Sequence, residues 1–352
     1  MHVDWDWIKQ RPHFIAEKLA NHFDLLICYP FSRKRSLLTK NNRKGFRFCP
    51  FILIPFRQRY RVFHYFNIFM LRIFFVMVLS KYKPNYIWIT SPELLPYIPE
   101  NNSKLIYDCM DDICGFHHSP AYRNELEDLE KNLVLHSSLI VASSQQLINV
   151  IKSRVKCSKK VYLIRNAFGG DILPAQVFSP LKQKEIYKIG YIGTISSWFD
   201  YDAINHCIEK INNIEIHLIG PVDTGLINNI NERIHFYGPI EHQNLYNYCK
   251  GFDCLILPFK INQLIKSVDP VKLYEYINFN KPIISVYYEE IDRFSPFVYF
   301  YNDSNSLYQL LTSLINQSFP KKYTNQERQG FLETNSWDIR VKEIIHHIEC
   351  LS

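Results

Sequence analysis

The chain has 352 residues, of which 47% are hydrophobic and 21% are charged. This length suits two domains that each bury a core, and the composition excludes a disordered or fibrous chain. The net charge of +7 is unevenly placed: residues 25–92 hold 13 of the 41 Lys and Arg and no Asp or Glu, which leaves 28 basic against 34 acidic residues elsewhere.

The cysteines and the first ten residues indicate in which cellular compartment the chain resides. The nine cysteines are scattered and include no CxxC pair. This pattern favours reduced thiols in a cytoplasmic setting and argues against a structural zinc. The first ten residues are acidic and rich in tryptophan, where a secretory signal would be basic and then apolar, so we expect no signal peptide.

The chain opens with MHVDWDWIKQRPH, a loop that leads into a predicted helix from about Pro12 to His22. Open α/β domains normally place a strand before such a loop, so we expect residues 1–3 to be a residual strand end or the chain to be shortened here. Asp4 and Asp6 form a DxD pattern, but no nucleotide-binding segment precedes it. We therefore expect no metal site.

Basic and aromatic side chains alternate through residues 33–61, and this density favours an anionic membrane surface as a partner. Each Lys or Arg near an anionic leaflet contributes roughly 1 kcal/mol, so several clusters suffice for peripheral docking. The apolar stretch 66–79, interrupted by Arg72, is too short to cross a bilayer. A solvated basic face over a core helix is the alternative. We expect no nucleic acid partner, because no RNP, zinc or helix-turn-helix pattern is present.

The first half alternates strands with helices, which predicts a doubly wound parallel sheet. The predicted strands are 25–29, 86–90, 104–107, 139–142 and 161–164, and the helices are 12–22, 60–81, 123–136 and one that starts near 144.

Carboxylates follow the strand 104–107, at Asp108, Asp111 and Asp112. Ligands of such sheets lie beyond the carboxyl ends of the strands, where a carboxylate can orient or deprotonate an acceptor hydroxyl. Asp111 is the candidate catalytic group, His117 and His118 are nearby alternatives, and helix capping is the structural alternative.

A polar connection at 169–184 separates a second alternating set. We predict an N-terminal domain at 1–172, a C-terminal domain at 173–336, and a terminal helix at 337–352 that crosses back. The predicted strands of the second half are 188–193, 215–220, 233–237, 254–257, 283–287 and 297–301, and the helices are 201–211, 243–249, one beginning at 270, and 304–317.

The segment LILPFKINQLIKSVDPVKLYEYINFNKPIIS, residues 255–285, has the strongest functional pattern. Asp269 suits an N-cap and Pro270 the first helical position. The amides of Val271 and Lys272 would then join the helix dipole in an anion site. Lys272 and Glu275 share one helix face, and they offer a cation for a diphosphate and a carboxylate for a ribose diol.

This segment resembles the donor-binding signature of family 4 glycosyltransferases of the GT-B fold, in which two glutamates bracket a glycine-rich turn and helix. Glu275 matches the second glutamate, which in the family holds the nucleotide ribose. Ser267 stands where the first glutamate belongs, and Pro270 stands on a turn glycine. The resemblance therefore implies diphosphate and ribose binding more firmly than sugar selectivity.

Other loops gain candidate roles from the same resemblance. Gly193 and Thr194 match the first loop of the family's C-terminal domain and would offer amides to the diphosphate, while Lys272 with Lys260 or Lys266 would supply positive charge. Gly238, Pro239 and Ile240 match the base-binding segment. A structural strand-end glycine and an ordinary Gly-Pro turn are the alternatives.

The opening loop resembles that of a bacterial polysaccharide branch of the same transferases. Arg11 and His13 are accordingly candidates for contacts with an acceptor or a donor phosphate. An N-terminal packing cluster is the alternative.

The resemblance implies an α/β chain of the GT-B fold, with two Rossmann-like domains and an interdomain cleft. It implies a retaining, metal-independent transfer of a hexose from a nucleotide-sugar to a glycan, lipid-linked acceptor in O-antigen or capsule synthesis, with no cofactor. Lys272 would stabilise the leaving diphosphate. A nucleotide-sugar 2-epimerase and a non-catalytic membrane-associated scaffold are the alternatives.

Overall fold

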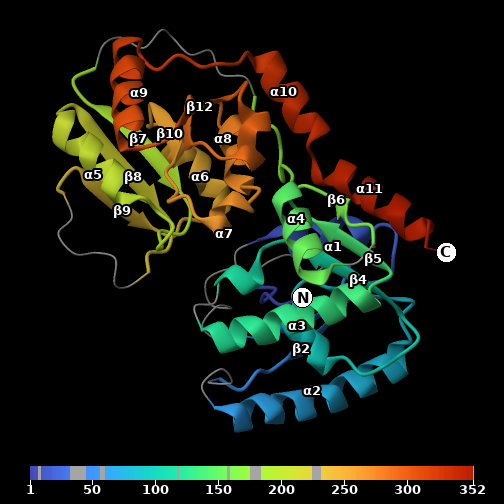
Figure 1. The fold of residues 1–352 in the computed structure, drawn as a ribbon. Helices are drawn as coiled ribbons and strands as arrows, with labels where there is room; N and C mark the ends of the chain where they lie inside the picture. Colours follow the sequence, from blue (N-terminus) through green and yellow to red (C-terminus); the bar gives the residue numbers. More distant parts are fainter. Residues whose placement is uncertain are drawn as a thin grey trace. The chain divides into compact units, whose positions relative to one another are not determined.

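The computed structural model describes residues 1–6, 9–31, 45–55, 60–116, 119–156, 159–174, 184–223 and 231–351. The chain forms two compact units (Figure 1), one of residues 1–166 with 337–352 and the other of residues 167–336. The boundary between them therefore precedes the predicted position after residue 172. Every pair of neighbouring strands in the described sheets is parallel.

The N-terminal unit contains a two-stranded and a four-stranded sheet, in the orders β1-β2 and β3-β4-β5-β6. Its strands are β1 (Leu26–Pro30), β2 (Arg47–Phe51), β3 (Tyr86–Ile89), β4 (Lys104–Cys109), β5 (Leu139–Ala142) and β6 (Tyr162–Leu163). Its helices are α1 (Arg11–Leu19), α2 (Arg61–Tyr82), α3 (Pro120–His136), α4 (Gln145–Val155) and α11 (Trp337–Glu349), with 3-10 turns η1 (Pro92–Tyr97) and η2 (Ile113–Phe116).

The terminal helix α11 packs on the first helix of the chain. The ring of Trp337 stacks on Phe14 with centroids 5.3 Å apart, and Lys18 pairs with Asp338 at 2.7 Å. The end of the chain thus belongs to the N-terminal unit, and α1 and α11 cover one another.

Helix α2 contacts its unit through a narrow face. The amide of Asn67 brackets the backbone of Ile54, and Leu71 is buried in the core. The helix has 22 residues, and its most apolar 18-residue window has a mean hydropathy of 1.9 with only 17% buried. By length and composition it could cross a membrane, so the expectation that this stretch is too short is wrong: the helical segment extends beyond residues 66–79 on both sides.

The C-terminal unit is built on one six-stranded sheet in the order β12-β11-β10-β7-β8-β9. Its strands are β7 (Tyr187–Ile192), β8 (Ile214–Ile219), β9 (Ile234–Gly238), β10 (Cys254–Leu257), β11 (Ile283–Val286) and β12 (Val298–Tyr301). Its helices are α5 (Tyr201–Lys210), α6 (His242–Cys249), α7 (Gln263–Lys266), α8 (Val271–Asn278), α9 (Ser304–Asn316) and α10 (Asn325–Thr334), with the 3-10 turn η3 (Glu289–Phe294).

The order of the strands creates a switch point in this sheet. From β7 the chain moves outward through β8 and β9, and then returns to the other side of β7 with β10. Doubly wound sheets bind ligands beyond the carboxyl ends of the strands at such a point. The loops that follow β7 and β10 are therefore where a ligand is expected in this unit.

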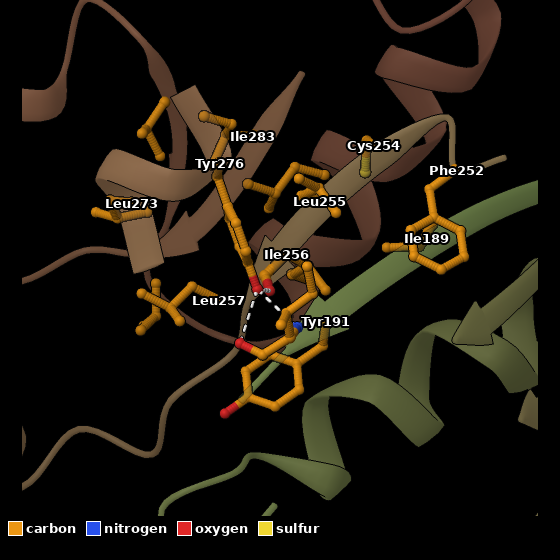
Figure 2. Close-up of a cluster of buried hydrophobic side chains, with 14 of the residues drawn as sticks. Ile189, Tyr191, Phe252, Cys254, Leu255, Ile256, Leu257, Leu273, Tyr276 and Ile283 are labelled. Atoms are coloured by element: carbon orange, nitrogen blue, oxygen red, sulfur yellow. Dashed lines mark hydrogen bonds between the residues drawn. The ribbon is translucent and has the colours of Figure 1, made fainter. Parts of the chain in front are cut away.

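A buried tyrosine of α8 holds the two strands that part at the switch point. The pairing of β7 with β10 ends at Gly190 and Leu255, short of the carboxyl ends of both strands. Figure 2 shows the Tyr276 hydroxyl at the separation, where it accepts from the amide of Ile192 at 2.8 Å and lies 3.4 Å from the carbonyl oxygens of Ile192 and Ile256. Tyr276 thereby satisfies backbone groups that the ladder leaves open.

We predict that Tyr276→Phe lowers the free energy of unfolding by about 1–3 kcal/mol, because the buried amide of Ile192 loses its acceptor. Urea unfolding of the full chain measures this. Tyr248→Phe is the matched control, since its ring is half exposed on α6. Equal midpoints for Tyr276→Phe and wild type would show that the hydroxyl does not support the strand ends.

Candidate functional site

The strand ends of the C-terminal unit are bound closely to one another. The amide of Gly193 donates to the carbonyl of Ile219 at 2.9 Å, and the amide of Gly220 donates to that of Gly238 at 2.9 Å. A Cβ at Gly220 would lie 2.0 Å from the carbonyl oxygen of Gly193, so only glycine fits here. The Gly193 amide, predicted to reach a diphosphate, is therefore already used within the sheet.

Thr194 supplies the available amide in this loop. Its N–H has no acceptor in the described part of the chain, while its carbonyl accepts from the Tyr191 hydroxyl at 2.9 Å and from the Trp198 indole at 3.2 Å. These two side chains fix the direction of the peptide. Thr194 is thus a better candidate than Gly193 for an anion contact.

The start of α8 differs from the prediction in one position. Pro270 occupies the N-cap and not the first helical turn, and no side chain caps the helix. Asp269 does not cap it, because its buried carboxylate pairs with Arg293 of η3. The amides of Val271 and Lys272 have no acceptors among the described residues, so two N–H groups stand at the positive end of the helix dipole.

Lys272 and Glu275 lie on the same face of this helix, as the spacing predicts. The Lys272 ammonium lies 2.8 Å from Glu275 Oε2. The lysine side chain is partly exposed and the glutamate side chain nearly buried. A lysine paired in this way can turn towards a diphosphate, and the glutamate can then accept from hydroxyl groups of a bound diol.

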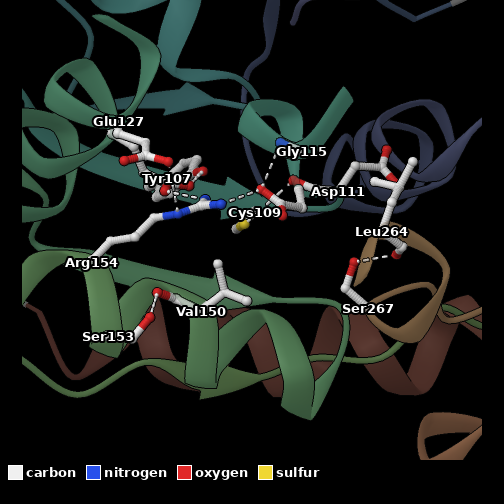
Figure 3. Close-up of polar contacts among 12 residues, drawn as sticks. Tyr107, Cys109, Asp111, Gly115, Glu127, Val150, Ser153, Arg154, Leu264 and Ser267 are labelled. Atoms are coloured by element: carbon white, nitrogen blue, oxygen red, sulfur yellow. Dashed lines mark hydrogen bonds and ion pairs between the residues drawn. The ribbon is translucent and has the colours of Figure 1, made fainter. Parts of the chain in front are cut away.

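Two predicted donor contacts have other partners. The Ser267 hydroxyl is buried and donates to the carbonyl of Leu264 at 2.7 Å at the end of α7 (Figure 3). This hydrogen bond stabilises the local turn. Lys260 pairs with Asp202 of α5 at 2.8 Å. Lys266 is exposed and remains the second cation near α8.

The predicted base-binding segment ends the edge strand β9. Gly238 has a φ of 69° and its carbonyl accepts from Gly220, while Pro239 is exposed and has no N–H to offer. Ile240 packs partly against the core. Contact of residues 238–240 with a nucleobase stays a prediction.

The N-terminal unit buries both residues that were assigned to phosphate or acceptor. Arg11 is 2% exposed, and its Nε donates to Asp108 at 2.9 and 3.2 Å while its Nη1 donates to the carbonyl of Ile164 at 2.7 Å. His13 is fully buried, accepts from the amide of Gln10 at 3.1 Å and lies 3.1 Å from the carbonyl of Trp5. Both residues hold the first loop and β4 together, as the packing alternative has it, and their contact with an acceptor or a donor phosphate stays a prediction.

A second arginine binds the next carboxylates. Arg154 of α4 pairs with Asp112 at 2.8 Å and with Glu130 at 2.9 Å, and Glu130 also accepts from the Tyr107 hydroxyl at 2.9 Å (Figure 3). Asp112 further accepts from the amide of Gly115. Asp112 is therefore a structural carboxylate.

Asp111 lies between these two ion pairs and has a different environment. Its carboxylate has no hydrogen-bond or ion-pair partner among the described residues. Burial, together with the charges of Asp108 and Asp112, raises the pKa of Asp111 to about 7, against the opposing effect of Arg11. A carboxyl group with a pKa near neutrality suits proton transfer, so the geometry favours Asp111 among the three.

Several predicted residues lie outside the described part. These are His117, His118 and most of the basic segment, including Arg33, Lys34 and Arg35. Sequence reasoning missed Tyr276, Arg154 and Arg293, whose roles depend on partners far away in the chain. No local pattern marks any of them.

Comparison with known proteins identifies the fold. No protein-family model matches the chain. The chain is 21% identical over 264 residues to TuaH of Bacillus subtilis (strain 168), a glycosyltransferase assigned to teichuronic acid biosynthesis. The match covers 69% of this chain and 66% of TuaH, so it spans a little less than two thirds of that relative.

Several solved structures resemble nearly the whole chain. Sucrose-phosphate synthase from Thermosynechococcus elongatus has a TM-score of 0.74 at 13% identity, with 97% of this chain and 92% of that chain covered. HepE from Anabaena, in complex with UDP and glucose, has a TM-score of 0.67 at 12% identity, with 96% and 95% covered. The predicted fold class is confirmed: the chain has the GT-B fold.

We predict that stability falls as the pH drops from about 6.5 to 4, because burial lowers the pKa of His13 to about 4 while the unfolded chain binds the proton near 6.5. The unfolded state then holds more protons in this window, which costs on the order of 2–3 kcal/mol at its acid end. Chemical unfolding measured at a series of pH values should show that the free energy of unfolding falls less steeply with decreasing pH in His13→Gln than in wild type. His22→Gln is the control, since His22 is exposed, and its pH dependence should equal that of wild type. A wild-type pH slope in His13→Gln would contradict the neutral buried imidazole.

Proposed function

We propose that the chain is a glycosyltransferase that moves a hexose from a nucleoside diphosphate sugar to a glycan acceptor in bacterial surface polysaccharide synthesis. The single observation that carries this proposal is the start of α8, with its two open amides and the Lys272–Glu275 pair. The GT-B fold and the likeness to TuaH support the reaction class, and the UDP in the HepE structure supports a nucleotide donor.

The donor site follows from the charges at the switch point. The amides of Val271, Lys272 and Thr194 receive the diphosphate, and the Lys272 ammonium leaves Glu275 to meet the charge. Glu275 then accepts from the ribose hydroxyls. As the sugar bond breaks, negative charge grows on the leaving diphosphate, and these fixed donors stabilise it without reorganisation. We propose retention of configuration and no requirement for a metal in this transfer.

The acceptor binds to the N-terminal unit in this proposal. Asp111 orients or deprotonates the attacking hydroxyl, since its pKa of about 7 lets it accept a proton at neutral pH. Arg11 and Arg154 act on the neighbouring carboxylates, Asp108 and Asp112, and keep them in place. They are positioning residues that leave Asp111 as the reactive one.

We also propose that the protein docks on the anionic inner face of the cytoplasmic membrane through α2. Bulky side chains of this helix are exposed, among them Tyr65, Phe69, Met70, Val76 and Met77. Contiguous exposed apolar surface of this kind marks an interaction site. Because the opposite face of α2 is attached to the unit through Asn67 and Leu71, a helix lying in the interface fits better than one spanning the bilayer.

A lipid-linked acceptor agrees with a cavity beneath the same helix. The cavity has a volume of about 710 Å³ and is lined by apolar residues that include Ile15, Leu19, Phe75 and Leu79. Phe75 and Leu79 belong to α2, so this one helix lines the cavity and presents its other side outward. An acyl or isoprenoid chain would leave the membrane at this helix.

We predict that UDP, GDP or dTDP, or one of their sugars, stabilises the chain against heat and binds in calorimetry. Glu275→Gln should weaken that binding by about 10- to 100-fold, because a hydrogen bond from a diol to a carboxylate is worth about 1.5–3 kcal/mol. Lys272→Ala should mainly lower turnover, by roughly 100-fold, because it removes a donor that meets developing charge.

The matched control is Glu343→Gln on α11, whose glutamate pairs with Arg340 in the same i,i+3 geometry. Incubation with donor alone separates a transferase from a 2-epimerase, which would change the sugar without an acceptor. A chain that binds none of the nucleotides would be a scaffold, and the proposal would fall.

For the membrane, we predict that the protein sediments with vesicles of phosphatidylglycerol and phosphatidylcholine and much less with phosphatidylcholine alone. Phe69→Asp combined with Met77→Asp should abolish sedimentation, since both side chains are largely exposed on α2. Ile186→Asp, exposed on the C-terminal unit, is the control. Undiminished sedimentation of the α2 variant would refute docking through this helix.

A further inference from the structure

Three metal-ligating side chains meet on one face of the C-terminal sheet, apart from the donor site. Glu215 and His217 lie two residues apart on β8, so they point to the same face. His235 of β9 is the direct register partner of His217. One ligand atom of each residue lies within 4.8 Å of the others.

The distance between Glu215 and His217 fits tetrahedral coordination, and the distance between Glu215 and His235 is slightly longer. Oε2 of Glu215 lies 3.3 Å from Nε2 of His217 and 3.7 Å from Nε2 of His235. Ligand atoms about 2.0 Å from a tetrahedral Zn²⁺ lie roughly 3.3 Å apart. The rings of His217 and His235 are stacked with centroids 4.8 Å apart, so His235 must turn its ring as well as move towards Glu215 to complete a three-ligand site. The side chain of His235 is partly exposed, which leaves it room to move.

Apart from their contacts with the Glu215 carboxylate, the imidazole nitrogens that face the cluster have no partner in the described part of the chain. Nε2 of His217 and Nε2 of His235 are both buried and neither makes a well-aligned hydrogen bond there. A buried polar atom without a partner is costly, so an unmet ligand is indicated. The other nitrogen of His217, Nδ1, lies 2.8 Å from the Tyr237 hydroxyl. One ring nitrogen anchored and the other open is the arrangement of a metal-binding histidine.

The surroundings hold His217 in place. Its ring packs against Phe252 with centroids 5.2 Å apart, and Phe252 fits there because Gly190 has no side chain. The position of one ligand is therefore fixed by the core of the sheet.

We propose that Glu215, His217 and His235 bind one Zn²⁺ or a similar borderline divalent cation, with a water at the fourth position. Histidine and carboxylate ligands in this number suit zinc, cobalt and nickel better than magnesium or calcium. The ion would join the edge strand β9 to β8, next to the segment 238–240. It would support that segment and take no part in the transfer, so the inference is independent of the proposed function.

This inference departs from the sequence expectation of no structural zinc. That expectation considered cysteine pairs, whereas these ligands come from two strands that only the sheet register brings together. Eighteen positions separate residues 217 and 235 in the sequence.

The test uses the full chain freed of metal with a chelator. Calorimetry with Zn²⁺ should show one site that His235→Ala and Glu215→Gln remove, and Tyr237→Phe should weaken it about 10-fold by releasing Nδ1 of His217. His206→Ala is the matched control, since this histidine bonds to Asn305 at the surface of the same unit. Unchanged affinity in both His235→Ala and Glu215→Gln would overturn the site.

Co²⁺ provides a second readout that separates these ligands from the cysteines. The bound ion should give tetrahedral visible absorption without a thiolate charge-transfer band, and the absorption should vanish in His235→Ala. A thiolate band, or octahedral absorption only, would also overturn the proposal. Circular dichroism of each variant checks that loss of binding does not reflect unfolding.

Discussion

The arrangement of the C-terminal unit depends on one buried hydroxyl. β7 and β10 stop pairing before their ends, and Tyr276 supplies the hydrogen bonds that the separated backbones lack. The same residue belongs to α8, so the contact also fixes the helix that carries Lys272 and Glu275. One side chain therefore links the separated strand ends to the helix that carries the candidate donor site.

The charged side chains of the candidate sites have different environments in the two units. In the N-terminal unit, the buried Arg11 and the partly buried Arg154 pair with the carboxylates next to Asp111, and a buried carboxylate without its partner would be strongly unfavourable. In the C-terminal unit, the partly exposed Lys272 and the nearly buried Glu275 hold one another. In the proposed function, the first arrangement keeps the carboxylates next to Asp111 in place, and a bound ligand separates the ion pair of the second.

Periodic patterns made most of the fold predictable. β5 and β10 have the predicted bounds, because short runs of buried apolar residues between turns are distinctive. β2 was missed since its sequence, RFCPF, is basic and contains proline, and α10 was missed since its sequence, NQERQGFLET, is mostly polar. The site was harder: Lys272 and Glu275 follow from helical spacing, whereas the burial of Arg11 and His13 depends on Asp108 and Trp5, which local sequence does not place beside them.

The most direct test of the account is a crystal structure of the chain with UDP. The account predicts that the diphosphate oxygens lie within hydrogen-bond distance of the amides of Val271 and Lys272, with the Lys272–Glu275 pair opened and Glu275 bonded to the ribose hydroxyls. A UDP bound elsewhere, with α8 unoccupied and its Lys272–Glu275 pair unchanged, would contradict it.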